Sequence, residues 1–176
     1  MRRTWTCAAA LLAVIVVIAG SGAIASAPAP NRTELTRSYT LPYRIAQAPA
    51  SDAMETVMLT LLNQSRRAVG LRPLWANTTL RWVARTHGAD MFAHGYLSHQ
   101  SRDGRLPLDR IEGAGLSPWH IGENLAYART VPDAHRLLMN SPGHRANILS
   151  PVYRRIGIGV MDGGADGVIV VEDFTD

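Results

Sequence analysis

The sequence contains a single cysteine, Cys7, and no lysine. Cys7 lies in an N-terminal stretch that we expect to be removed, so the remaining chain has no thiol. This excludes disulfides, thiolate catalysis and cysteine-based zinc sites. The absence of lysine excludes Schiff-base chemistry and the P-loop lysine. All 18 basic residues are therefore arginines. They are scattered and lack aromatic interleaving, so we expect no nucleic-acid partner.

Residues 1–27 have the pattern of a signal peptide. Arg2 and Arg3 precede an unbroken apolar stretch from Ala8 to Ala19, and Ala25-Ser26-Ala27 fits the pattern for cleavage after Ala27. The apolar stretch is shorter than the roughly 20 residues that a membrane-spanning helix needs, so we expect no stable span after cleavage. An uncleaved anchor is the alternative. The sequence thus predicts a secreted, extracellular protein that begins near Pro28, with association with the cell envelope left open.

The chain without its leader is expected to form one domain. Residues 28–50 contain four prolines and show no helical or alternating period, which predicts a linker or arm. Residues 51–176 are enough to bury a core without cross-links. Helical patterns come first and strand patterns last, which favours an α+β fold.

Three substantial helices are expected. Asp52 and Glu55 form a capping pair for the first, and Gly70 follows its end. The second begins at Asn77 or Thr78 and runs to about Gly95, with His87 and His94 on its apolar stripe as structural histidines. A short helix is expected from Pro107 to Ile111. The third substantial helix opens at Pro132 and Asp133 and is terminated by Pro142.

The C-terminal part is predicted to be a β-hairpin. Ile156, Ile158 and Val160 alternate with glycines, and a second apolar run spans 168–174. The Asp162-Gly163-Gly164 segment between them is typical of a hairpin connection. Residues 119–126, with their Gly-Glu-Asn run, are expected to be extended.

Three side chains that can carry chemistry come from separate segments: His99, Glu123 and His144. Two imidazoles and one carboxylate can hold a divalent metal with one position open, as catalytic zinc sites do. Without a metal, the same groups can act as general acid and base. Either use requires the fold to bring them together. Asn124 and Asn147 are expected to satisfy loop backbone.

These residues belong to a series of motifs that resembles the short bacterial branch of the CAP superfamily, whose domain is also called SCP. That superfamily includes the cysteine-rich secretory proteins, venom antigens and plant pathogenesis-related proteins. The resemblance covers roughly residues 52–174 and implies an α-β-α sandwich, in which helices flank a central antiparallel sheet. The motifs are Tyr96-Leu97-Ser98-His99, Asp103-Gly104, Asp109-Arg110-Ile111, Gly122-Glu123-Asn124-Leu125-Ala126, Ser141-Pro142-Gly143-His144-Arg145-Ala146-Asn147-Ile148-Leu149 and Ile156-Gly157-Ile158-Gly159.

The resemblance also implies a cleft lined by two histidines and two acids. His99 and His144 match the histidines and Glu123 matches one acid. The second acid lies in the family a little before the Gly-His pair, where this chain reads Leu137-Leu138-Met139-Asn140-Ser141 without a carboxylate. A proton shuttle that needs two carboxylates is therefore in question, whereas a metal site of His99, Glu123 and His144 is not.

The sequence is compatible with three functions. The first is a secreted, non-enzymatic domain whose cleft binds a divalent metal, most simply zinc, or a small or lipidic ligand, as the resemblance implies. The second is an extracellular metal-assisted hydrolase of peptide or ester bonds, with His99, Glu123 and His144 as the catalytic candidates. The third is a protein that binds cell-wall material or a host partner and whose cleft is vestigial. No H-E-x-x-H or G-x-S-x-G pattern supports the hydrolase.

Overall fold

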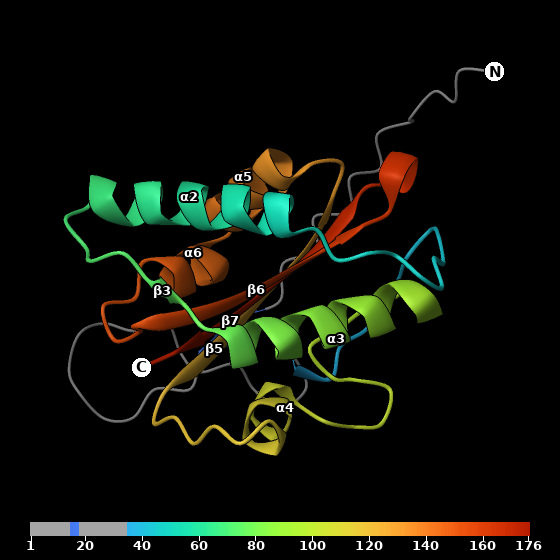
Figure 1. Ribbon diagram of the computed structural model, residues 1–176, viewed down its shortest axis with the longest axis horizontal. Coiled ribbons are helices and arrows are strands. Elements are labelled where there is room, and N and C mark those ends of the chain that lie inside the picture. The colour runs from blue at the N-terminus through green and yellow to red at the C-terminus, as the bar shows by residue number, and fades with distance from the viewer. Residues whose placement is uncertain (1–14, 18–34) are drawn as a thin grey trace.

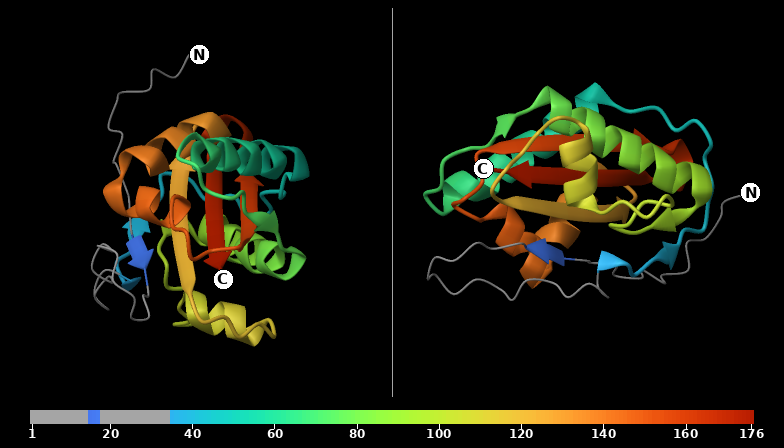
Figure 2. Two further views of the ribbon diagram at one scale, coloured as in Figure 1. Left: turned by 90° about the vertical axis from the view of Figure 1, so that its left-hand side faces the viewer. Right: turned by 90° about the horizontal axis from the view of Figure 1, so that it is seen from below.

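The computed structural model describes residues 15–17 and 35–176. Most of the predicted signal peptide and its cleavage site after Ala27 lie outside the described residues. The described chain has a five-stranded sheet in the order β1-β5-β7-β6-β3, between two layers of helices. Helices α2, α5 and α6 cover one face, and α3 and α4 cover the other (Figures 1 and 2). This confirms the α-β-α sandwich.

The elements follow the order that the sequence pattern predicts, helices first and the long hairpin last. The helices are α2 (Asp52–Ala68), α3 (Thr78–His94), α4 (Pro107–Gly113), α5 (Val131–Asn140) and α6 (Pro142–Ile148), with a 3₁₀ turn η1 (Gly164–Asp166). The main sheet contains β1 (Ile15–Val17), β3 (Trp75–Ala76), β5 (Ile121–Ala128), β6 (Arg155–Asp162) and β7 (Val168–Thr175). A second, two-stranded sheet pairs β2 (Tyr39–Thr40) with β4 (Tyr96–Leu97).

Two helix ends differ from the expectation. The N-cap of α2 is Ser51, whose hydroxyl accepts from the backbone N–H of Met54, so the predicted capping pair of Asp52 and Glu55 is wrong. Ser51 stands one residue earlier and its short hydroxyl reaches the free N–H groups of the first turn. Pro142 ends α5 as predicted, but it also begins α6, because proline lacks only an N–H that the first helical turn leaves unpaired.

The predicted hairpin is formed by β6 and β7, which lie antiparallel at the centre of the sheet. Helix α3 packs directly on β6, because the glycines of β6 present no side chain there. A Cβ atom on Gly157 would lie 2.1 Å from the carbonyl carbon of Leu80 in α3. Glycine alternates with Ile156 and Ile158 because α3 lies too close to this strand for a side chain on that face.

Residues 35–50, part of the predicted linker or arm, lie against the domain. Leu41 donates a backbone hydrogen bond to Gly95, and Asp162 donates one to Pro49. The side chains of Leu41 and Ala48 are buried in the core on the α3 side. This segment is therefore an ordered arm. No helix of the described residues is long and apolar enough to cross a membrane.

Candidate functional site

The centre of the site is the carboxylate of Glu123 on β5. Side chains alternate along a strand, and Leu125 packs in the core with residues of α3, so Glu123 points to the α3–α4 side of the sheet. Its Oε1 accepts from Nδ1 of His99 at 2.5 Å, and its Oε2 accepts from Nη2 of Arg110 at 2.5 Å. All three side chains are buried. The structure therefore brings His99 and Glu123 together, as predicted, and adds an arginine.

Arg110 is held in place by the loop that carries His99. Helix α4 begins with Pro107 and projects Arg110 toward β5. Its Nη1 donates to the carbonyl of His99 at 2.7 Å and to the hydroxyl of Ser101 at 3.0 Å. The guanidinium thus fixes both the loop and the carboxylate with its rigid set of donors. The orientation of His99 is set from two sides.

Of the two acids at this centre, Glu123 carries the negative charge. Burial by itself raises the pKa of Glu123, but the positive charge of Arg110 and the hydrogen bond from His99 outweigh it and lower the pKa to about 2. Asp173 on β7 lies opposite Glu123 in the strand register. Burial, together with the charge of Glu123, raises the pKa of Asp173 well above its usual range. Of these two neighbouring acids, Glu123 is the one that is stabilised as an anion.

His87 of α3 extends this network beneath the sheet. Its Nε2 lies 2.8 Å from the carbonyl of Ser98, which can only accept, so Nε2 carries the proton. Nδ1 then accepts from the hydroxyl of Ser101 at 3.3 Å, and that hydroxyl accepts from Arg110. Burial lowers the pKa of His87 to about 4, with a further contribution from Arg110. His87 is structural, as expected, and it supports the site.

His144 lies on α6, on the other face of the sheet from Glu123. Asn124 connects it to the strand: its Nδ2 donates to the carbonyl of His144 at 3.2 Å and to Oε2 of Glu172 at 2.9 Å. Asn147 donates to Oδ1 of Asn124 at 2.9 Å. Both asparagines therefore belong to a buried chain of polar groups that joins β5, β7 and α6. Both asparagines donate to a backbone carbonyl, Asn124 to His144 and Asn147 to Glu123, as expected, but they do so from within β5 and α6 and not from loops.

Glu172 is the acid on this second face. It is fully buried, and burial raises its pKa to about 7 despite the hydrogen bond from Asn124. Its Oε1 has no hydrogen-bond partner among the described residues. The carboxylate missing before the Gly-His pair is thus not replaced on α5, but β7 supplies two buried acids, Glu172 and Asp173, one on each face of the sheet.

The edge of β5 beside Glu123 carries β1. Val16 lies opposite Glu123 and Ile15 lies opposite Asn124, in an antiparallel pair. Strand β1 also contacts α6, which bears His144. Because residues 15–17 fall inside the predicted signal peptide, cleavage after Ala27 would remove this strand and leave the edge of β5 open at the site.

His99, Glu123 and His144 fit a divalent metal only if Glu123 orients a metal-binding histidine and does not itself coordinate the metal. Both of its oxygens are occupied, and Arg110 places a cation beside it. In metal sites a ligating histidine commonly donates its other ring N–H to a carboxylate, which is the role that Glu123 has toward His99. The coordinating atom of His99 would then be Nε2. Among the described residues, no three His, Asp or Glu side chains are grouped to hold a metal.

Sequence reasoning missed Arg110, Glu172 and Asp173. A signal for the two acids was present, because Glu172 and Asp173 interrupt the apolar run of a central strand, where charged residues are rarely found without a partner. Arg110 lies within the Asp109-Arg110-Ile111 motif, but its partner lies 13 residues away on another element. Only the packing of α4 against β5 joins the two.

Comparisons with known proteins agree with this architecture. A relative from Bacillus subtilis (strain 168), the "Uncharacterized protein YkwD", is 36% identical over 139 residues, or 78% of this chain and 52% of the relative. The "Uncharacterized membrane protein YlbC" of the same organism is 36% identical over 108 residues, 60% of this chain and 31% of that protein. The chain therefore spans about half, or less, of the length of these relatives.

Solved structures show the same fold. An extracellular protein with an SCP domain from Bacillus anthracis str. Ames superposes with a TM-score of 0.64 at 26% identity, over 70% of this chain and 40% of that one. An outer surface protein from Borrelia burgdorferi gives 0.67 at 21% identity, over 73% of this chain and 98% of that one. A sequence model of the cysteine-rich secretory protein family, CAP, matches residues 59–174. The chain belongs to the CAP family.

Proposed function

We propose that this chain is a secreted CAP protein that binds a divalent metal or a small ligand at the β5 edge, between His99 and His144, and that catalyses no reaction there. The observation that carries the proposal is the arrangement of Arg110, Glu123 and His99. A carboxylate held between a guanidinium and an imidazole orients the histidine rigidly. Removal of the leader would open the edge of β5 to a ligand.

The state of Glu123 favours binding over hydrolysis. An effective general acid or base needs a pKa near the working pH and an oxygen that can reach the substrate. The pKa of Glu123 is lowered to about 2, chiefly because Arg110 offsets the effect of burial, and both oxygens are already bonded. Glu123 is therefore suited to holding His99, and poorly suited to exchanging protons.

A bound metal would be coordinated by the imidazoles of His99 and His144, and it would supply a Lewis-acidic centre. Zinc is the first choice because imidazole suits it and no thiolate is present. We expect zinc titrated into the protein beginning at Pro28, prepared without a histidine tag, to give saturable heat in calorimetry. His99→Ala and His144→Ala should abolish that heat. Glu123→Gln should weaken affinity about 10- to 100-fold.

The matched control is His94→Ala, because His94 is an exposed histidine at the end of α3 whose ring pairs with Asp90 and not with Glu123. It should bind zinc as the unchanged protein does. Wild-type protein that gives no heat at neutral pH would remove the metal from the proposal. Organic extraction of the purified protein, followed by mass spectrometry, then tests whether a small or lipidic ligand occupies the cleft instead.

The alternative is an extracellular hydrolase, and one observation favours it: Glu172 has a pKa raised to about 7 by burial, near the range of a general base. Turnover of a peptide or ester panel that is lost in Glu172→Gln and in His144→Ala would establish this alternative. Activity that survives both substitutions would come from a contaminant, and the binding proposal would stand.

A further inference from the structure

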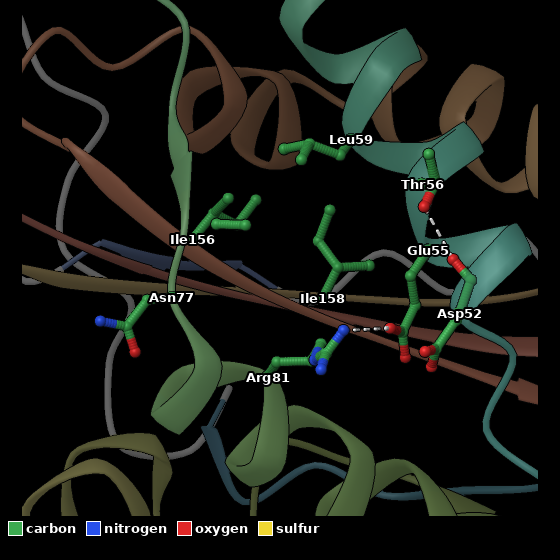
Figure 3. A pocket seen from close by; sticks show the side chains of 9 residues that line it. Asp52, Glu55, Thr56, Leu59, Asn77, Arg81, Ile156 and Ile158 are labelled. Atoms are coloured by element: carbon green, nitrogen blue, oxygen red, sulfur yellow. Dashed lines mark hydrogen bonds and ion pairs between the residues drawn. The ribbon is translucent and has the colours of Figure 1, made fainter.

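A cavity of about 180 Å³ lies at the opposite edge of the sheet from the histidines, between α2, β3, α3 and β6 (Figure 3). Its floor is apolar and its rim is polar and charged: Leu59, Ile156 and Ile158 form the floor, and Asp52, Glu55, Thr56, Asn77 and Arg81 lie around it. Two strands, β6 and β7, separate this edge from β5. The cavity is therefore independent of the site proposed above.

The backbone of β6 has a gap in its hydrogen bonding at this cavity. Alternate residues of the strand direct their N–H and C=O groups away from β7. Three of them are paired: Asn77 donates to Ile156, Ser51 donates to Val160, and Asp162 donates to Pro49. Strand β3 ends at Ala76, and no hydrogen bond from the described residues reaches the N–H or C=O of Ile158 on this side.

Ile158 therefore presents its backbone N–H and C=O to the cavity. One residue of an extended peptide can pair with both groups. Buried backbone groups are almost always paired, so such a gap marks a place where a ligand can add hydrogen bonds. Pairing to the backbone of an exposed strand is an established mode of peptide recognition.

Arg81 supplies a positive charge at the rim. Its Nη1 lies 3.9 Å from Oε2 of Glu55, and its side chain is 43% exposed. Glu55 is already held by Arg85, whose Nε and Nη2 each donate to it at 2.7 Å. Arg81 can therefore turn to a ligand carboxylate without leaving Glu55 unpaired, and a guanidinium suits a carboxylate because it donates two parallel hydrogen bonds.

We infer that this cavity binds an acylated amino acid with an aliphatic side chain, either as a free molecule or as the carboxyl-terminal residue of a peptide. The ligand amide N–H donates to the carbonyl of Ile158. Its carboxylate accepts from the N–H of Ile158 and from Arg81, and its side chain packs on Leu59 and Ile156. A cavity of about 180 Å³ has room for one residue of this size.

The test is a calorimetric titration of the purified protein with N-acetyl-L-valine and with a longer peptide that ends in valine. Both should bind saturably if the terminal residue is what is recognised, and only the first if the ligand is a free molecule. The N-methylated amide, which lacks the donor, and the C-terminal carboxamide, which lacks the charge, should each bind at least about tenfold more weakly. Absence of saturable binding by both unmodified compounds overturns the inference.

Two variants locate the binding. Arg81→Gln should weaken it at least about tenfold, and Ala76→Ile, which fills the cavity from β3, should abolish it. Arg136→Gln removes an exposed arginine of α5 and should leave affinity unchanged. Affinity that is unchanged in both cavity variants, with melting temperatures that show both to be folded, places the binding elsewhere and refutes the assignment.

Discussion

Arg110 and Glu123 form an ion pair in the interior of the protein, with 2.5 Å between Nη2 and Oε2 and with side chains that are 5% and 0% exposed. A pair removed from water stabilises a fold only when further hydrogen bonds satisfy both partners. Here most of their polar atoms are satisfied: Arg110 also bonds the carbonyl of His99 and Glu123 also accepts from the His99 ring, and only Nε of Arg110 has no partner among the described residues. The position of His99 therefore depends on this pair.

Replacing Arg110 by glutamine should destabilise the protein strongly. The substitution leaves the carboxylate of Glu123 in the interior without its cation, which costs on the order of 3–5 kcal/mol in the free energy of unfolding. Chemical denaturation monitored by circular dichroism measures this loss. The double variant Arg110→Gln/Glu123→Gln should recover part of it, because both charges are gone. Equal stability of the single and double variants would contradict the assigned pairing.

Glu172→Gln should stabilise the protein at alkaline pH. The folded pKa of Glu172, about 7, lies above the ordinary value of 4.5, so ionisation is harder in the folded state. The free energy of unfolding therefore falls as the pH rises from about 4.5 through 7. Glutamine removes this loss and can still accept from Asn124. The stabilisation of the variant over the unchanged protein should be larger at about pH 8 than at about pH 5, by about 2 kcal/mol in the free energy of unfolding.

Thermal melts across this pH range test the prediction for Glu172. Glu112→Gln, which changes an exposed glutamate of α4, is the control and should show no such trend. A stability difference for Glu172→Gln that does not change between the two pH values would show that the carboxyl of Glu172 is not buried as described.

His87 should make the protein sensitive to mild acid. Burial lowers its folded pKa to about 4 from an ordinary value of 6.5. Between these two pH values, the histidine is protonated in the unfolded chain and neutral in the folded chain. Stability is complete above about pH 6.5 and is lost as the pH falls toward 4. The loss between about pH 7 and pH 5 should be roughly 2 kcal/mol. His87→Gln should be less stable at pH 7, and its stability should fall much less over this interval, as urea titrations at each pH would reveal.

Gly157→Ala should destabilise the sandwich by at least about 2 kcal/mol, because the new methyl group meets the backbone of Leu80 and α3 must move away from β6. Gly113→Ala is the matched control, since nothing lies within 4 Å of the added Cβ atom at the end of α4. Denaturation midpoints of the two variants compare them directly. Similar midpoints would show that α3 does not approach β6 this closely.

Much of the fold could be predicted from local patterns. The helix from Thr78 to His94, with Asn77 before it and Gly95 after it, carries its own start and stop signals. The hairpin of β6 and β7 is indicated by the alternation of apolar residues with glycine along β6 and by the glycines between the strands. The N-cap of α2 is Ser51, one residue before the Asp52 that the sequence predicts, because Ser51 and Asp52 are both good caps and only the backbone geometry distinguishes them.

The sequence by itself determined the helices α2, α3, α4 and α5 and the hairpin of β6 and β7, because caps and periodicity are properties of neighbouring residues, and its motifs singled out His99, Glu123 and His144 as candidates. Only the tertiary structure decided what those side chains contact. It placed Arg110 on Glu123, His144 on the other face of the sheet, and Glu172 and Asp173 in the interior. Burial and the nearness of charges set each pKa, and both depend on contacts between residues far apart along the chain.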